Sequence, residues 1–175
     1  LPLELGLAET QQTLVMNNLR RKVMLQADGQ LKSGKDVIMA ALLGAEEYGL
    51  ATSALIVLGC VMMRKCHLNT CPVGVATQNP ELRRRFHGEA DNLVTFFRFI
   101  AEEVRENLAA LGYRKMEDII GRSDLLERNR EIDHWKIKNL DLGGLLTIPA
   151  EEGTNAIRCV DAQDHKIDNV LDIHL

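Results

Sequence analysis

The chain has 175 residues, of which 46% are hydrophobic and 26% charged, and its formal net charge is −4. This acidic balance excludes a strongly basic nucleic-acid-binding protein, and the basic runs at 20–22 and 83–85 are interpreted as solvated faces. No apolar run reaches membrane-spanning length and the N-terminus does not resemble a signal peptide, so we expect one cytoplasmic globular domain.

The first predicted elements are a helix and a strand. Residues 9–22 carry Leu14, Val15 and Leu19 at helical spacing, with Thr10 as the candidate N-cap. Residues 23–27 then form a short apolar run that ends at Asp28-Gly29, which is typical of a buried strand.

A second helix and strand follow. Ser33 and Asp36 have the spacing of a capping box, and the predicted helix over 37–43 ends at Gly44. The apolar run at 54–58 is predicted to be the next strand. Strand, helix and strand in this order indicate an α/β fold with a parallel sheet.

The loops at 28–34 and 44–52 are candidate phosphate-binding loops. Each contains glycine and leads toward a helix, and a helix N-terminus offers unpaired N–H groups and a positive dipole end. Ordinary turn and cap chemistry is the alternative interpretation of both loops.

Three of the four cysteines, Cys60, Cys66 and Cys71, fall within twelve positions. Five residues separate the first two and four separate the last two, and Pro72 follows Cys71 directly, as in ferredoxin-type cluster runs. Sulfur this concentrated beside glycines indicates one shared ligand.

Several interpretations of the cysteines remain open. They could be buried, unreactive core residues, or zinc ligands together with His67. They could also hold an iron–sulfur cluster, and three thiolates without a fourth fit a three-iron cluster better than a four-iron one. A disulfide is disfavoured because the number is odd and no secretory segment is seen.

Beyond the cysteines, a long amphipathic helix is predicted over 91–111 and ends at Gly112. Its aromatic residues Phe96, Phe97 and Phe99 are assigned to the core. A shorter helix is predicted over 115–120, ending at Gly121. Cys159 is interpreted as a thiol that ligates no metal. The C-terminal tail, residues 162–175, is expected to be loosely ordered or to dock on the helices.

The residues 59–78, GCVMMRKCHLNTCPVGVATQ, closely resemble the cluster loop of the glutamate synthase large-subunit family. The resemblance runs from about residue 4 to 126 and returns weakly at 163–169. It implies a [3Fe–4S] cluster on Cys60, Cys66 and Cys71, next to an FMN-bearing (β/α)₈ barrel. His67, between two of the candidate ligands, is expected to pack or hydrogen-bond near the cluster.

The resemblance also implies a domain organisation. Residues 1–126 would be the C-terminal part of a (β/α)₈ TIM barrel with its cluster loop and following helices, and residues 127–175 a linker and the start of a C-terminal β-helix domain. A whole barrel takes about 200 residues or more. We therefore expect an incomplete barrel from a longer protein.

Carried over position by position, the resemblance assigns the FMN phosphate contacts to Gly29, Gly49, Ala51 and Thr52. One departure stands out, because Gln30 replaces the second glycine of the family's first loop. If Gln30 needs a positive φ, the loop is strained or reshaped and flavin affinity comes into question.

In the family, FMN- and iron–sulfur-dependent reduction forms L-glutamate from 2-oxoglutarate and glutamine-derived ammonia. The electrons come from a small NADPH-dependent flavoprotein subunit or from ferredoxin. No catalytic residue is assigned within these residues, and the piece alone is expected to be inactive. Two alternatives are a zinc-stabilised partner-binding module and a phosphate-binding barrel enzyme without redox chemistry.

Overall fold

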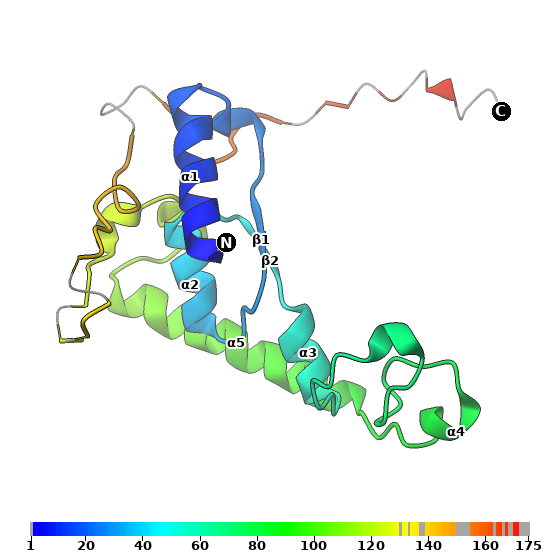
Figure 1. Cartoon of the computed structure of the whole chain (residues 1–175). Helices are drawn as coiled ribbons and strands as arrows, with labels where there is room; N and C mark the ends of the chain where they lie inside the picture. The colour runs from blue at the N-terminus through cyan, green and yellow to red at the C-terminus, as the bar shows by residue number, and fades with distance from the viewer. Residues whose placement is uncertain are drawn as a thin grey trace.

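A computed structural model describes residues 2–129 continuously and, beyond them, residues 131–132, 134–136, 139–149, 155–162, 164–165, 167 and 170–171. Two parallel strands, β1 (Gln26–Asp28) and β2 (Glu47–Gly49), form the sheet of this described part. Helix α2 (Gly34–Leu42) joins them and runs beside them in Figure 1. Parallel strands need such a crossover, so the predicted α/β class is confirmed.

The position of the second strand was predicted wrongly. Residues 54–58 lie in and just after helix α3 (Ala51–Val57), and the strand that pairs with β1 comes earlier, at Glu47–Gly49. The hydroxyl of Ser53 donates to the carbonyls of Leu50 and Leu31, which ties this short helix to the loop after β1. A short apolar run fits a strand and a helix equally well, and here the tertiary contacts decide.

The first helix also differs from the prediction. Helix α1 spans Leu3–Met16, and a left-handed Asn18 (φ 52°) lies just past its end. Thr10 is inside the helix, where its hydroxyl donates to the carbonyl of Gly6 at 2.7 Å, so it is not the N-cap. Strand β1 begins at Gln26, three residues later than predicted.

The basic run at 20–22 is not a solvated face throughout. It forms the 3₁₀ turn η1 (Arg20–Lys22), in which Arg21 and Lys22 are exposed but Arg20 is 0% exposed. A buried guanidinium is tolerated only with partners, and Arg20 has them in Gln11 and Glu46. The second basic run, at 83–85, is exposed as predicted.

The core forms on both sides of α2. On one side, residues of α1, β1 and α2 pack together, and on the other α2 packs against α5 (Ala90–Ala110) and the 3₁₀ turn η3 (Met116–Asp118). The buried residues are Leu7, Ala8, Ala27, Leu31, Ala40, Leu43 and Ala45 on the first side and Ile38, Ala41, Leu42, Leu108 and Ile119 on the second. The capping box is confirmed, since the Ser33 hydroxyl accepts from the Asp36 N–H and the Asp36 carboxylate accepts from the Ser33 N–H.

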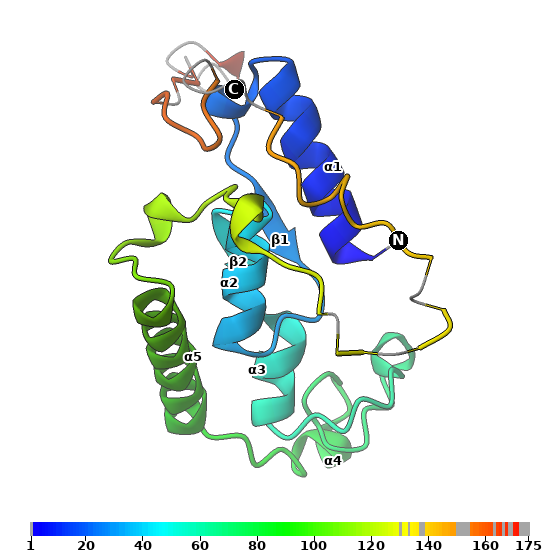
Figure 2. The ribbon, with the colours of Figure 1, turned by 90° about the vertical axis from the view of Figure 1, so that its left-hand side faces the viewer.

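Helix α5 is confirmed almost to the residue, but the assignment of its aromatic residues to the core was wrong, because none of the three is buried and Phe96 is only half-buried. Phe99 is 69% exposed and Phe97 is 40% exposed, while Leu108 near the other end is buried. Figure 2 shows α5 alongside α2 at one end and extending past it at the other. The exposed aromatics lie on the extending half.

Gly34, at the start of α2, lies in close contact with the backbone of α5. A Cβ at this position would lie 2.7 Å from the backbone nitrogen of Val104 and 2.8 Å from the carbonyl oxygen of Ile100. We expect Gly34→Ala to lower the free energy of unfolding by about 1–3 kcal/mol, because backbone atoms cannot move aside cheaply. Urea denaturation measures this, with Lys35→Ala, at an exposed position one residue on, as the control that should change little.

Shorter turns complete the described part. They are η2 (Cys66–Leu68), α4 (Pro80–Arg83) and η4 (Ser123–Leu125). The helix predicted over 115–120 is reduced to the 3₁₀ turn η3, which ends at Asp118 with Ile119 as its C-cap, so Gly121 (φ 73°) does not end it. The sequence Glu151-Glu152-Gly153 also indicates a loop, and these residues lie outside the described part of the chain. No helix in the described part is long and apolar enough to cross a membrane.

Candidate functional site

The loop between α3 and α4 turns back on itself several times. It adopts the left-handed backbone conformation at Gly59, Met62, Arg64, Asn69 and Gly74, with φ between 55° and 93°. Three of these are not glycine, and such residues adopt this conformation at a cost that surrounding contacts must offset. Figures 1 and 2 both show this loop and α4 gathered at one end of the molecule, beyond α3.

Two asparagines hold the loop closed. The backbone oxygen of Asn69 accepts from the Thr77 hydroxyl at 2.8 Å, and its side-chain oxygen accepts from the Gln78 N–H at 2.6 Å. Asn79 then caps α4 by accepting from the N–H groups of its first turn. A Cβ at Gly74 would collide with the carbonyl of Leu82, so glycine is needed where the loop lies against α4.

All three cysteines of the loop line one shallow hollow, whose space of about 240 Å³ is largely open to solvent. Cys71 is 7% exposed, Cys60 is half-buried, Cys66 is exposed, and all three thiols are free. The rest of the lining comes from the loop itself, Val61, Met62, Met63, Arg64, Lys65, Pro72 and Val73. The structure therefore brings the predicted ligand residues around a common space.

Backbone N–H groups surround the sulfur of Cys71. Hydrogen bonding from the N–H of Ala76 in the first place, and from those of Val73, Val75 and Gly74, lowers the pKa of the Cys71 thiol, although desolvation opposes it. Stabilisation of a thiolate by backbone amides suits a sulfur that ligates a metal centre, since the thiolate is the ligand form.

The donor set in the described residues is not arranged around a single point. No group of three or more His, Cys, Asp or Glu side chains there is placed to hold one metal ion. His67 is exposed on η2. The cysteines face a hollow from separate parts of the loop.

The four residues assigned to the flavin phosphate lie at one edge of the sheet. Asp28 pairs with Gly49 at the ends of the two strands, and Gly29 follows directly with φ 148°. Ala51 and Thr52 begin α3, whose N-cap residue Leu50 makes no side-chain capping bond. A Cβ at Gly49 would lie 2.7 Å from the carboxyl carbon of Asp28, which shows how closely the strand ends approach.

The N-terminus of α2, by contrast, is already occupied. The Asp36 carboxylate accepts from the N–H groups of Lys32 and Ser33, and the Glu103 carboxylate accepts from the Gly34 N–H at 2.6 Å. The chain's own carboxylates thus fill the place that the loop at 28–34 was predicted to offer to a phosphate. The open helix start at this edge belongs to α3.

The cavity beside the first loop contains only one of the four assigned residues. It encloses about 500 Å³, part of it open to solvent, between α1, α2 and the loop after β1. Gly29 and Gln30 line it with Leu3, Glu4, Leu7, Leu31, Asp36, Met39, Ala40 and Leu43. The structure brings Gly29, Gly49, Ala51 and Thr52 to one edge, but not into this cavity.

Gln30 does adopt the left-handed conformation, with φ 61°, as its position in a glycine-rich loop suggested. We expect Gln30→Gly to raise the free energy of unfolding by about 0.5–1 kcal/mol, because glycine adopts this conformation without the Cβ clash. Thermal unfolding measures the change. Gln30→Ala keeps the Cβ and should give no such gain, and an equal gain in both variants would contradict this explanation.

Sequence reasoning missed a buried polar cluster formed by Gln11, Arg20 and Glu46. Gln11 is 6% exposed and Arg20 0% exposed, and they join through a hydrogen bond between the guanidinium and the side-chain oxygen of Gln11. One signal was present in the sequence: Gln11 lies four residues from both Leu7 and Val15, on the buried face of α1.

A profile of the family described as "Conserved region in glutamate synthase" matches residues 1–114. Among similar proteins, the "Glutamate synthase [NADPH] large chain" of Bacillus subtilis is 58% identical over 174 residues, which are 99% of this chain and 11% of that protein. The "Glutamate synthase [NADH]" of Schizosaccharomyces pombe is 54% identical over 175 residues, 98% of this chain and 8% of that protein.

A relative with a different electron donor in its name is equally similar. The "Ferredoxin-dependent glutamate synthase 2" of Synechocystis is 55% identical over 148 residues, 85% of this chain and 10% of that protein. The chain thus spans about a tenth of the length of these relatives.

Proposed function

The chain belongs to the glutamate synthase family, and we propose that it is the segment of such an enzyme that carries a [3Fe–4S] cluster beside an FMN site. In this proposal residues 1–126 are the C-terminal part of a (β/α)₈ barrel, and residues 127–175 are a linker and the start of a β-helix domain. The parallel β1–α2–β2 unit is the kind of repeat from which such a barrel is built.

One observation carries the assignment of the cluster. Three free thiols, Cys60, Cys66 and Cys71, line one hollow in a loop whose backbone N–H groups lower the pKa of the most buried thiol. In a three-iron cluster each thiolate binds a different iron atom, so the sulfurs need not meet at one point. Three thiolates from a loop that wraps a compact space suit that donor requirement.

The flavin contacts are proposed at the edge where the strands end. Gly49, Ala51 and Thr52 would present the backbone N–H groups at the start of α3 to the phosphate, and Gly29 would line the neighbouring turn. When bound, the cluster would supply single-electron transfer, and FMN would supply hydride transfer. The residues of this chain would hold the two groups near one another. Helix α3 is suited to this role because it directly links the two sites.

The reaction proposed for the whole protein is the reductive formation of L-glutamate from 2-oxoglutarate and glutamine-derived ammonia. The proposed electron donor is a small NADPH-dependent flavoprotein subunit or ferredoxin. Relatives named for both kinds of donor support this pair of partners. No residue of this chain is proposed as a catalytic acid or base.

The test is an anaerobic preparation of the intact protein, followed by iron and sulfide analysis, visible spectroscopy and EPR of the oxidised sample. We expect a brown protein with a three-iron stoichiometry and bound FMN. A colourless protein that contains zinc would replace this proposal with a zinc-stabilised module. A protein that binds FMN but no metal would refute the assignment of the three cysteines.

A further inference from the structure

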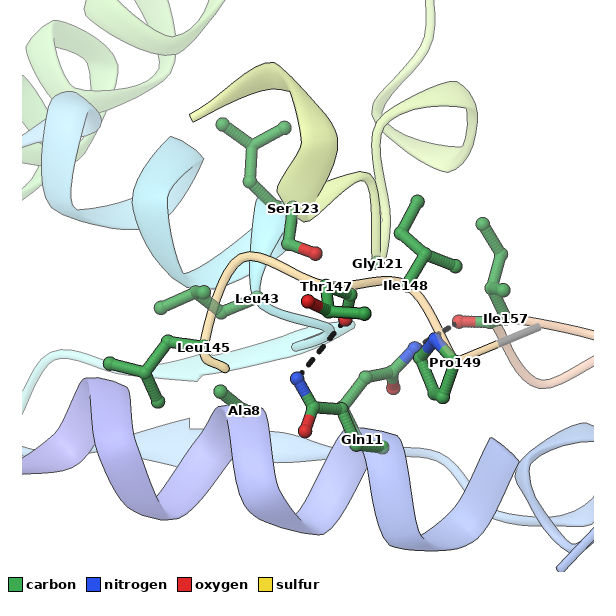
Figure 3. Close-up of a pocket in the computed structure, with 12 residues that line it drawn as sticks. Ala8, Gln11, Leu43, Gly121, Ser123, Leu145, Thr147, Ile148, Pro149 and Ile157 are labelled. Atoms are coloured by element: carbon green, nitrogen blue, oxygen red, sulfur yellow. Dashed lines mark hydrogen bonds between the residues drawn. The ribbon is translucent and has the colours of Figure 1, made fainter. Parts of the chain in front are cut away.

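A short segment near the C-terminus is docked on the buried polar cluster of Gln11, Arg20 and Glu46. Residues 157–161 lie against α1 and the turn η1, more than a hundred positions away in sequence. Figure 3 shows the side chain of Gln11 reaching from α1 to the backbone of Ile157. The segment is therefore held by polar contacts with defined geometry.

Arg20 organises this cluster. Its guanidinium donates to the side-chain oxygen of Gln11 at 2.5 Å, to the carbonyl of Gly44 at 2.9 Å and to Glu46 Oε2 at 2.7 Å. Arg20 is fully buried and the Glu46 side chain is 10% exposed. Their charged forms are therefore stabilised by these hydrogen bonds in place of contact with water. The fork of donors fixes the orientation of the Glu46 carboxylate.

Two glycines make room for the Gln11 amide. A Cβ at Gly44 would lie 2.5 Å from Gln11 Oε1, and a Cβ at Gly121 would lie 2.6 Å from Gln11 Nε2. The amide nitrogen, placed in this slot, donates to the carbonyl of Ile157 at 2.7 Å. The slot fits an amide and sets the direction in which it donates.

The second oxygen of Glu46 faces the docked segment. Glu46 Oε1 accepts from the N–H of Cys159 at 2.8 Å. The segment is held at two more places, because the N–H groups of Val160 and Asp161 donate to the carbonyl of Arg21 and the Asp161 carboxylate pairs with the Arg21 guanidinium at 2.9 Å. Only the contact with Glu46 leads directly to the sheet.

Glu46 immediately precedes β2. Its own N–H and that of Glu47 both donate to the carbonyl of Leu25, and its carboxylate accepts from the Leu25 N–H. Gly49 lies three residues further along the chain, at the end of β2, and Ala51 begins α3. Movement of the Glu46 carboxylate would therefore disturb the backbone that leads into the loop 49–52.

We propose that Glu46 is a positioning residue that couples the docking of residues 157–161 to the geometry of the loop 49–52. If the N–H of Cys159 moves away, Glu46 Oε1 loses its partner in a place that is nearly closed to water. The carboxylate then rotates or takes in water, and the start of β2 loosens. That this loop contacts a flavin rests on the proposed function, whereas the coupling itself does not.

The test is hydrogen exchange of the intact, flavin-free protein, comparing the peptide over 46–52 with peptides of α2 and α5. Cys159→Pro removes the N–H that Glu46 accepts, together with the thiol, and fixes φ at this position, whereas Cys159→Ala removes the thiol and keeps the N–H. We expect Cys159→Pro to speed exchange over 46–52 on the order of tenfold, with α2 and α5 unchanged, and Cys159→Ala to match the unaltered protein.

A second route avoids proline. Asp161→Ala removes the ion pair with Arg21 and should speed the same peptide by a smaller factor. Unchanged exchange over 46–52 in both variants, or an equal increase in α2 and α5, would overturn the coupling. FMN binding to the unaltered protein is measured separately by flavin fluorescence. Its failure would remove the flavin assignment and leave the exchange result standing.

Discussion

Glu46→Ala is expected to lower the free energy of unfolding by about 3–5 kcal/mol, because it leaves the fully buried guanidinium of Arg20 without its counter-charge. The loss extends further, since the N–H groups of Leu25 and Cys159 also give up their acceptor. Urea denaturation followed by far-UV circular dichroism measures the change.

Two controls distinguish the effect of removing a buried charge from the effect of removing any charge. Glu102→Ala removes the exposed partner of Arg105 on α5 and should leave the denaturation midpoint nearly unchanged. The double variant Arg20→Met with Glu46→Ala removes both buried charges and should recover part of the lost stability. A double variant as unstable as the sum of its single variants would contradict a direct interaction between the two side chains.

Parts of the fold that depend on neighbours in sequence were predictable. The capping box of Ser33 and Asp36 is a contact across three residues, and α5 repeats its apolar residues through nearly six turns. Gly121 has a positive φ, because no other residue adopts that conformation as cheaply. In each case the information lies within a few residues.

The errors involve contacts between distant residues. Strand β2 is only Glu47–Gly49, which carries neither an apolar run nor an alternation, and it is a strand because its partner β1 lies beside it. Arg20 looks like a surface residue until Glu46, 26 positions away, is placed next to it. A local pattern carries no record of such partners.

The candidate site also combines features that the local sequence predicts with features that depend on distant contacts. The spacing of Cys60, Cys66 and Cys71 predicted that one loop would bring them around a common space, because the ligands are close in sequence. The N–H groups around Cys71 could not be predicted, since their directions follow from the turn at Gly74. The self-capping of α2 was likewise hidden, because one of its carboxylates comes from Glu103 on α5.

The second large effect is expected at the cluster, where Cys71→Ser should abolish the iron–sulfur absorption of the intact protein and the electron transfer that depends on it. Cys71 is the most buried of the three thiols, and backbone N–H groups favour its thiolate form. A serine hydroxyl does not ionise in the same pH range, and with three thiolates in the loop no fourth is at hand to replace the lost ligand.

Cys159→Ser is the matched control for this experiment. Cys159 is half-buried and its sulfur contacts the carbonyl of Asp161, so the substitution makes the same chemical change in the docked segment, away from the loop. Iron content and the visible spectrum of this variant should equal those of the unaltered protein. If Cys71→Ser retained its iron, or if Cys159→Ser lost as much, the three cysteines of the loop would not be the ligand set. Because the buried core between α2 and α5 contains no residue of the loop, far-UV circular dichroism of Cys71→Ser should stay close to that of the unaltered protein, which distinguishes a lost ligand from a lost fold.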